Sequence, residues 1–99
     1  MPAYLIANID VHDRATFETY RAQVPAVIAS FGGRYLVRGG EVLPVEGDPG
    51  LKRVVVLEFP SLAAARRFWD SPEYEPVKRL REQSATSHVA LVDGMPPST

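Results

Sequence analysis

The chain has 99 residues, 45% of them hydrophobic, and its 11 Lys and Arg against 12 Asp and Glu leave a formal net charge of −1. This size and composition predict one globular domain, and the balanced charge gives no general reason to bind nucleic acid or an anionic membrane. Cys is absent, which excludes thiolate metal sites, iron–sulfur clusters and a Cys nucleophile. Because small secreted domains usually carry disulfides, and because the first residues lack a signal-peptide pattern, we expect a cytoplasmic protein.

The first third of the chain predicts a strand followed by a helix. Apolar residues alternate along 3–11, which is the pattern of a half-buried strand. Asp13 can cap a helix whose apolar residues recur at steps of three and four from Phe17 to Phe31. Pro25 lies inside this helix and should kink it, and Gly32-Gly33 should end it.

The rest of the chain predicts a hairpin, a broken helix and a last strand. Residues 34–38 and 53–59 read as paired strands, with a bulge or bend at Gly39-Gly40 and a continuation of the 34–38 strand over 41–46. Ser61 should cap a helix that turns Leu62, Ala65, Phe68 and Trp69 inward, and Ser71-Pro72 should restart it. The restarted helix should end near residue 83, before a strand over 88–92. We expect one domain over 1–94 and a flexible tail over 95–99.

The predicted order β-α-β-β-α-β favours an α+β, ferredoxin-like sandwich: a four-stranded antiparallel sheet with the helices on one face. The opposite face is then unusually apolar, since an open sheet face normally carries polar residues. A second copy of the same sheet is the simplest cover, so we expect a homodimer. The residues assigned to this face are Tyr4, Ile6, Asn8, Asp10, Arg34, Leu36, Arg38, Val54, Val56, Glu58, His88, Ala90 and Val92.

Several segments carry a recognisable pattern: Tyr4-Leu5-Ile6-Ala7, Tyr20, 32–40 (GGRYLVRGG), Glu58-Phe59-Pro60-Ser61, and Trp69 with 71–74 (SPEY). Through these residues the chain resembles the domain of unknown function 1330 family over about residues 3–94. That family is similar to the dimeric α+β barrel superfamily, which includes cofactor-independent monooxygenases, lactone isomerases, haem enzymes and proteins without known activity. The resemblance therefore implies a fold and a dimer, but no catalytic residues and no particular reaction.

Two residues are candidate general bases. His12 follows the first strand, and a loop His can accept a proton near neutral pH, although an exposed loop residue is the more common situation. Glu58 lies in a predicted central strand, where a carboxylate must be paired or perturbed. It could act as a base, or form a structural ion pair with Arg34 or Arg38. The spacing of His and carboxylates gives no metal-binding pair, so we expect no metal.

Arg38, Trp69 and Tyr74 are the candidate ligand-binding residues. Two aromatic side chains beside a helix break can line a pocket for a planar ligand, although core packing is the alternative for Trp69. The basic residues Lys78, Arg79 and Arg81 are interspersed with acidic ones and predict a solvated helix face.

These residues predict a small metabolite cleft near the break, without a cofactor and with no nucleic-acid or membrane partner. Two alternatives stay open. The first is a cofactor-independent monooxygenase- or isomerase-like enzyme acting on a small aromatic or dicarbonyl compound. The second is a structural or interaction module without a ligand. Whether the chain is an enzyme is undecided by its sequence.

Overall fold

The computed structural model describes residues 1–95 and shows seven elements in that range. Their order is β1 (Ala3–Val11), α1 (Arg14–Ser30), β2 (Arg34–Arg38), β3 (Arg53–Phe59), α2 (Leu62–Asp70), α3 (Glu75–Ser84) and β4 (Ala85–Asp93). The last strand thus begins three residues earlier than predicted. Of the predicted tail, residues 96–99 lie outside the described range.

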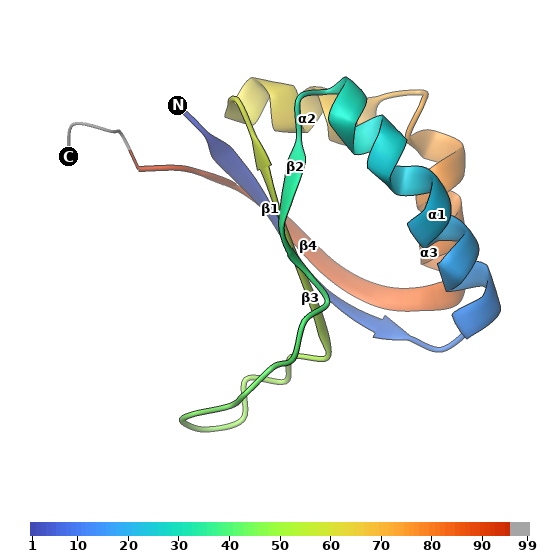
Figure 1. Ribbon diagram of the computed structural model, residues 1–99, viewed down its shortest axis with the longest axis vertical. Helices are drawn as coiled ribbons and strands as arrows, with labels where there is room; N and C mark the ends of the chain where they lie inside the picture. Colours follow the sequence, from blue (N-terminus) through green and yellow to red (C-terminus); the bar gives the residue numbers. More distant parts are fainter. Residues whose placement is uncertain (96–99) are drawn as a thin grey trace.

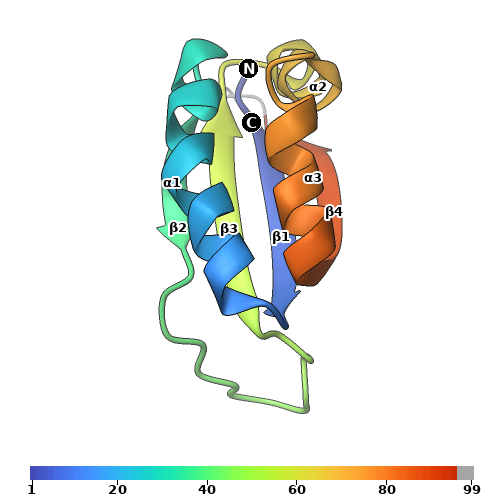
Figure 2. The ribbon, with the colours of Figure 1, turned by 90° about the vertical axis from the view of Figure 1, so that its right-hand side faces the viewer.

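The four strands form one antiparallel sheet in the order β2-β3-β1-β4. All three helices lie on one face of this sheet, with α1 and α3 side by side across it and α2 near one end (Figures 1 and 2). This arrangement confirms the α+β, ferredoxin-like prediction. No helix in residues 1–95 combines the length and the apolar character needed to cross a membrane.

Local signals in the sequence set most helix ends. The Asp13 carboxylate accepts a hydrogen bond from the Thr16 amide at 3.2 Å, and the Ser61 hydroxyl accepts one from the Ala64 amide at 3.0 Å. These bonds satisfy amides that have no partner within the first helical turn. Gly32 follows α1 with a φ of +79°, a conformation that glycine adopts without strain.

The break between α2 and α3 is closed by a buried serine. The Ser71 hydroxyl donates to the Phe68 carbonyl oxygen at 2.8 Å and accepts from the Tyr74 amide at 3.1 Å. One side chain therefore joins the end of α2 to the start of α3, and it fixes where Tyr74 enters the core.

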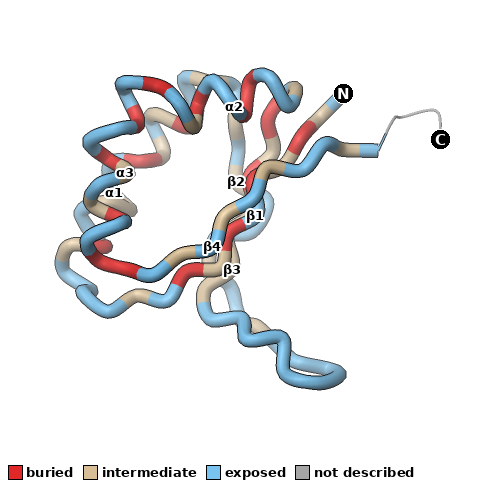
Figure 3. The backbone as a smooth tube through the Cα atoms, turned by 180° about the vertical axis from the view of Figure 1, so that it is seen from behind, coloured by how far each residue is buried: buried red, intermediate tan, exposed pale blue. Residues whose placement is uncertain are grey.

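The core lies between the sheet and the helices, where the buried segments of Figure 3 face one another. Phe68 is at its centre, with ring centroids 5.2 Å from Phe59 and 4.3 Å from Tyr74. The inward face of β1 is buried at Ala3, Leu5, Ala7 and Ile9, as the alternation predicted. The inward prediction for Leu62 is wrong, because its side chain stays 40% exposed at the start of α2.

The predictions about β2 are confirmed in part. The chain bends at Gly39, which has a φ of +71°, in agreement with the bulge or bend predicted there. A bulge also lies within the strand, where the register to β3 shifts between Tyr35 and Val37. Residues 41–46 do not continue the strand. Residues 39–52 instead form an arm that projects away from the body of the molecule (Figure 1). Asn8 holds the base of the arm, donating to the Gly50 carbonyl at 3.0 Å and accepting from the Lys52 amide at 2.8 Å.

The sheet face away from the helices is uncovered and apolar. Ile6 and Val92 are each 44% exposed, and Leu36 is 46% exposed. The arm adds Leu43 and Val45, which are 76% and 90% exposed. This surface matches the apolar face expected from the sequence, except that Arg38 lies on the helix side of the sheet.

Candidate ligand-binding site

A small cavity lies within the layer between the sheet and the helices. Its volume is about 40 Å³, which is room for about three waters by the usual requirement of ~10–15 Å³ each. All the elements contribute to its lining, which combines apolar, phenolic and guanidinium side chains. The lining residues are Leu5, Ala7, Ile9, Phe17, Tyr20, Arg21, Val24, Ile28, Tyr35, Arg38, Arg53, Val55, Leu57, Phe68, Trp69, Tyr74, Arg81 and Val89.

Three phenols, from α1, β2 and the turn before α3, line this cavity. The hydroxyls of Tyr20 on α1 and Tyr74, just before α3, lie 3.1 Å apart and share a hydrogen bond. Burial raises the pKa of Tyr20 far above its usual value, and the neighbouring Tyr74 adds to the rise. Burial also raises the pKa of Tyr35 on β2. Tyr20 and Tyr35 are therefore neutral hydrogen-bonding groups at physiological pH.

Arg81 on α3 is the most unusual residue of the cavity. It is only 6% exposed, and its guanidinium carbon lies 5.6 Å from the centre of the Trp69 ring. Burial alone would lower the pKa of Arg81, but the phenols of Tyr74 and Tyr20 raise it above its usual value. No carboxylate of residues 1–95 forms an ion pair with this guanidinium. A charge so deeply buried normally has such a partner.

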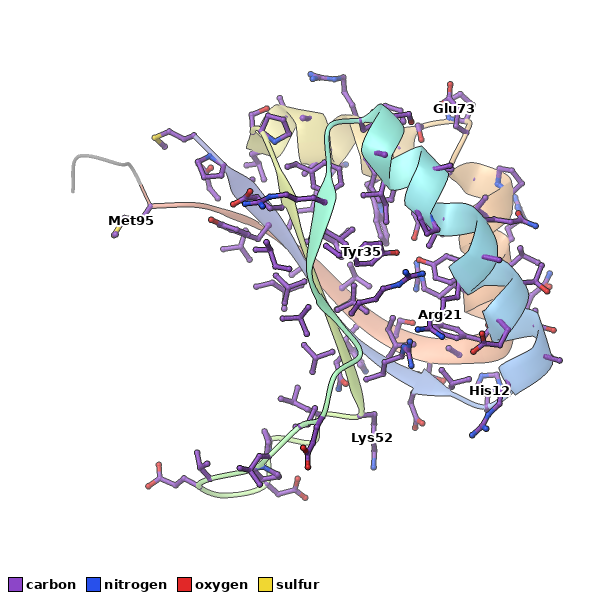
Figure 4. The ribbon with its side chains drawn as sticks, in the orientation of Figure 1. His12, Arg21, Tyr35, Lys52, Glu73 and Met95 are labelled. Atoms are coloured by element: carbon purple, nitrogen blue, oxygen red, sulfur yellow. The ribbon has the colours of Figure 1, made fainter. Side chains whose placement is uncertain are left out.

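Three further arginines line the same cavity. Arg38 donates to the Arg21 carbonyl oxygen at 3.0 Å and stacks 4.6 Å from the centre of the Tyr35 ring. Burial lowers the pKa of Arg53, and the charge of Arg21 lowers it further. Arg21 has a distant ion pair with Glu18 at 3.6 Å, but its buried Nε atom has no hydrogen-bond partner within the described chain. Figure 4 shows Arg21 and Tyr35 in the space between the sheet and α1.

The bulge in β2 explains why Arg38 belongs to this group. Strict alternation placed Arg38 on the open face of the sheet together with Arg34. The register shift after Tyr35 pairs Val37 with Val56 and Arg38 with Val55, so the two residues exchange faces. Val37 is consequently 39% exposed on the open face, and Arg38 lines the cavity.

The structure brings three of the five predicted site residues together. Arg38, Trp69 and Tyr74 all line the cavity, Tyr74 as a buried residue that is 2% exposed. His12 is exposed between β1 and α1, outside the space that holds Arg21 and Tyr35 (Figure 4). Glu58 is on the open face of the sheet, where its carboxylate accepts from the Arg34 guanidinium at 2.8 Å. Neither candidate base is part of the cavity.

Reasoning from the sequence missed most of the basic residues. Arg81 was assigned to a solvated face, but it shares the buried side of α3 with Val77 and Ser84. A charged residue at helical spacing from buried ones was the available signal. Arg21 and Arg53 gave no comparable signal, because each depends on how α1 and β3 approach one another.

The fold and cavity define a small ferredoxin-like α+β protein with a basic, phenol-rich interior site. The chain belongs to the family described as "Domain of unknown function (DUF1330)", whose sequence profile matches residues 2–95. No curated protein matches the chain.

Several solved structures share this fold. A protein of unknown function from Rhodopseudomonas palustris is 19% identical, with 97% of this chain and 84% of that one covered and a TM-score of 0.74. A variant of SnoaB, a cofactor-independent oxygenase from Streptomyces nogalater, is 22% identical, with 96% and 94% covered and a TM-score of 0.70. A dimeric ferredoxin-like protein of unknown function from Jannaschia sp. is 12% identical, with 95% and 100% covered and a TM-score of 0.71. At these identities the likeness concerns the fold alone.

Proposed function

We propose that this chain forms a cytoplasmic homodimer that binds a small metabolite in the sheet–helix cavity of each subunit. The observation that carries the binding proposal is Arg81, a guanidinium that is 6% exposed and has no ion pair among residues 1–95. A purely structural core would be more stable with an apolar side chain at such a position. Retention of a polar group at this cost is typical of a functional site.

Binding can be tested with a thermal-shift screen of a panel of small metabolites, since a ligand that binds only the folded protein raises its melting temperature. Hits are then titrated by calorimetry against the wild type and Trp69→Leu, which removes one aromatic wall. Arg66→Gln is the control, because Arg66 is exposed on the same helix and pairs with Asp70. A ligand whose affinity falls in Trp69→Leu alone supports the cavity. Hits that are insensitive to the cavity variant, or no hits at all, would refute it.

The homodimer proposal depends on the uncovered face of the sheet. Ile6 is at its centre, paired with Val56 on one side and Ala90 on the other. A contiguous apolar area of this kind marks an interaction surface, and the Jannaschia protein of this fold is described as dimeric. The exposed apolar residues of the arm extend the same surface. A second sheet of the same chain would cover both.

Size measurement by light scattering tests the dimer. The wild type is expected at twice the subunit mass of 10.9 kDa. Ile6→Glu should give a monomer, because a carboxylate buried without a partner costs several kcal/mol, on the order of 3–5. Leu62→Glu is the matched control, since Leu62 is 40% exposed on the helical side against 44% for Ile6. A wild type that stays monomeric at micromolar concentration would contradict the proposal.

The enzymatic alternative draws on the likeness to SnoaB, which is described as a cofactor-independent oxygenase. Such a reaction on this chain would need a group to accept the substrate's proton. Within the described residues, the cavity lining contains no His, Asp or Glu, and the candidate bases His12 and Glu58 lie elsewhere. Binding without turnover is therefore the function that the geometry supports best. Oxygen consumption in the presence of a ligand found by the screen would favour the enzyme instead.

A further inference from the structure

The polar groups of the cavity supply hydrogen-bond donors with too few acceptors. Tyr20 and Tyr74 carry two phenolic protons, and one of these is used in the bond between their oxygens. The second proton has no acceptor among the described residues. Arg81 adds guanidinium N–H groups, which are donors only; the phenol oxygens of Tyr74 and Tyr20 accept from it, and no carboxylate of the described residues pairs with it. The buried Nε of Arg21, which also lines the cavity, has no hydrogen-bond partner among the described residues. A buried donor in this state is costly, so solvent or a ligand must provide an acceptor.

The charge of the cavity lining also favours a ligand that accepts hydrogen bonds. Arg21, Arg38, Arg53 and Arg81 all line it, and no acidic side chain of the described chain does. Arg21 forms an ion pair with Glu18 at the long distance of 3.6 Å, and the Glu18 side chain is 56% exposed. The mutual repulsion of Arg21 and Arg53 and the burial of Arg81 are both relieved if a negative charge enters.

The size of the cavity and the shape of its guanidinium groups indicate which class of anion fits. A volume of about 40 Å³ suits a group of a few atoms. A planar guanidinium matches the two oxygens of a carboxylate with parallel hydrogen bonds. Trp69 and Tyr35 provide flat apolar surfaces for the remainder of such a molecule. A carboxylate thus provides hydrogen-bond acceptors, carries the negative charge that the arginines favour, and is small enough for the cavity.

We infer that the ligand of this cavity is a small carboxylic acid, whose carboxylate is bound by Arg81 and the Tyr20–Tyr74 hydroxyl pair. This inference rests on the proposed binding function and adds the chemical class of the ligand. Arg81 sets the binding position, and the other three arginines attract the anion to the cavity.

Matched pairs of probes test the inference: acetate against acetamide, and formate against formamide, at constant ionic strength with sulfate as the control anion. The amides keep the shape and remove the charge. Wild-type protein should bind the carboxylates, measured by calorimetry or by chemical-shift titration. Arg81→Met should weaken them by about 10- to 100-fold, the range for hydrogen bonds to a charged group. Arg79→Met is the control, because Arg79 is exposed on the same helix and pairs with Glu75 at 3.1 Å.

Arg81→Lys keeps the charge but loses the planar fork, so it should bind the carboxylates with intermediate affinity. Tyr20→Phe removes one phenolic proton and should weaken them independently, which covers the case in which Arg81→Met fails to fold. If amides bind as tightly as acids, or sulfate as tightly as acetate, the carboxylate inference is overturned while the cavity remains a binding site. If no carboxylate binds and metabolite screening also finds no ligand, the proposed function falls with it.

Discussion

Replacement of Ser71 by Ala tests how the break between α2 and α3 is stabilised. Ser71 is 6% exposed, and its hydroxyl both donates to the Phe68 carbonyl and accepts from the Tyr74 amide. After the substitution the Phe68 carbonyl keeps a bond from the Ser71 backbone amide at 3.2 Å. The Tyr74 amide loses its acceptor inside a buried region. We therefore expect the loss to come mainly from one unsatisfied N–H.

The expected loss is about 2 kcal/mol in the free energy of unfolding, from a range of ~1–3 for a buried unsatisfied group. For a domain of this size, that corresponds to a fall of about 8–16 °C in melting temperature. Chemical denaturation at 25 °C measures the free energy directly. Because Tyr74 follows the break, carboxylate binding in the cavity should weaken as well.

Ser84→Ala is the matched control. Ser84 is 0% exposed, so the burial of the two serines is similar. Its hydroxyl donates to the Leu80 carbonyl at 2.7 Å and, more weakly, to that of Arg81 at 3.3 Å, and it accepts no hydrogen bond within the described chain. Removal of this hydroxyl leaves no N–H group without an acceptor, so the loss in the free energy of unfolding should be about 1 kcal/mol or less. Equal losses in the two variants would refute the reasoning.

Three further predictions follow from local geometry. In Gly33→Ala the new Cβ would lie 2.6 Å from the Phe59 ring, so we expect a loss of about 1–3 kcal/mol by chemical denaturation, whereas Gly40→Ala, with nothing within 4 Å, should be close to neutral. In anion-free buffer, Arg81→Met should leave the melting temperature unchanged or raised, because it removes a buried charge without an ion pair; a large fall would show that Arg81 is structural. The hydrogen bond from the Thr16 side chain holds the pKa of Asp13 below its usual value, so its contribution to stability is present above the unfolded pKa and is lost as the pH falls through the folded one. Asp13→Asn should therefore flatten the decline of melting temperature below about pH 4, and an unchanged decline would contradict this assignment.

Much of the fold could be predicted from sequence because its signals are local. The alternation along β1 shows which face is buried, and Asp13 and Ser61 mark the first turns of two helices through hydrogen bonds to residues three positions away. The element order then leaves few sheet topologies with short connections. Trp69 and Tyr74 were identified as candidates because a helix break is itself visible in sequence, at Ser71-Pro72.

The composition of the site was decided by tertiary structure. Nothing in residues 34–38 (RYLVR) marks the bulge that places Arg38 on the helix side of the sheet, because the bulge arises from the pairing of β2 with a strand about 20 residues away. Glu58 was ambiguous until that same pairing placed it opposite Arg34 on the open face. Periodicity shows which side of an element is buried, but only the packing of α1, α3 and the sheet determines that Arg81 is buried beside two phenols and without a carboxylate. The sequence alone thus determined the layers of this protein, and long-range contacts determined the chemistry enclosed between them.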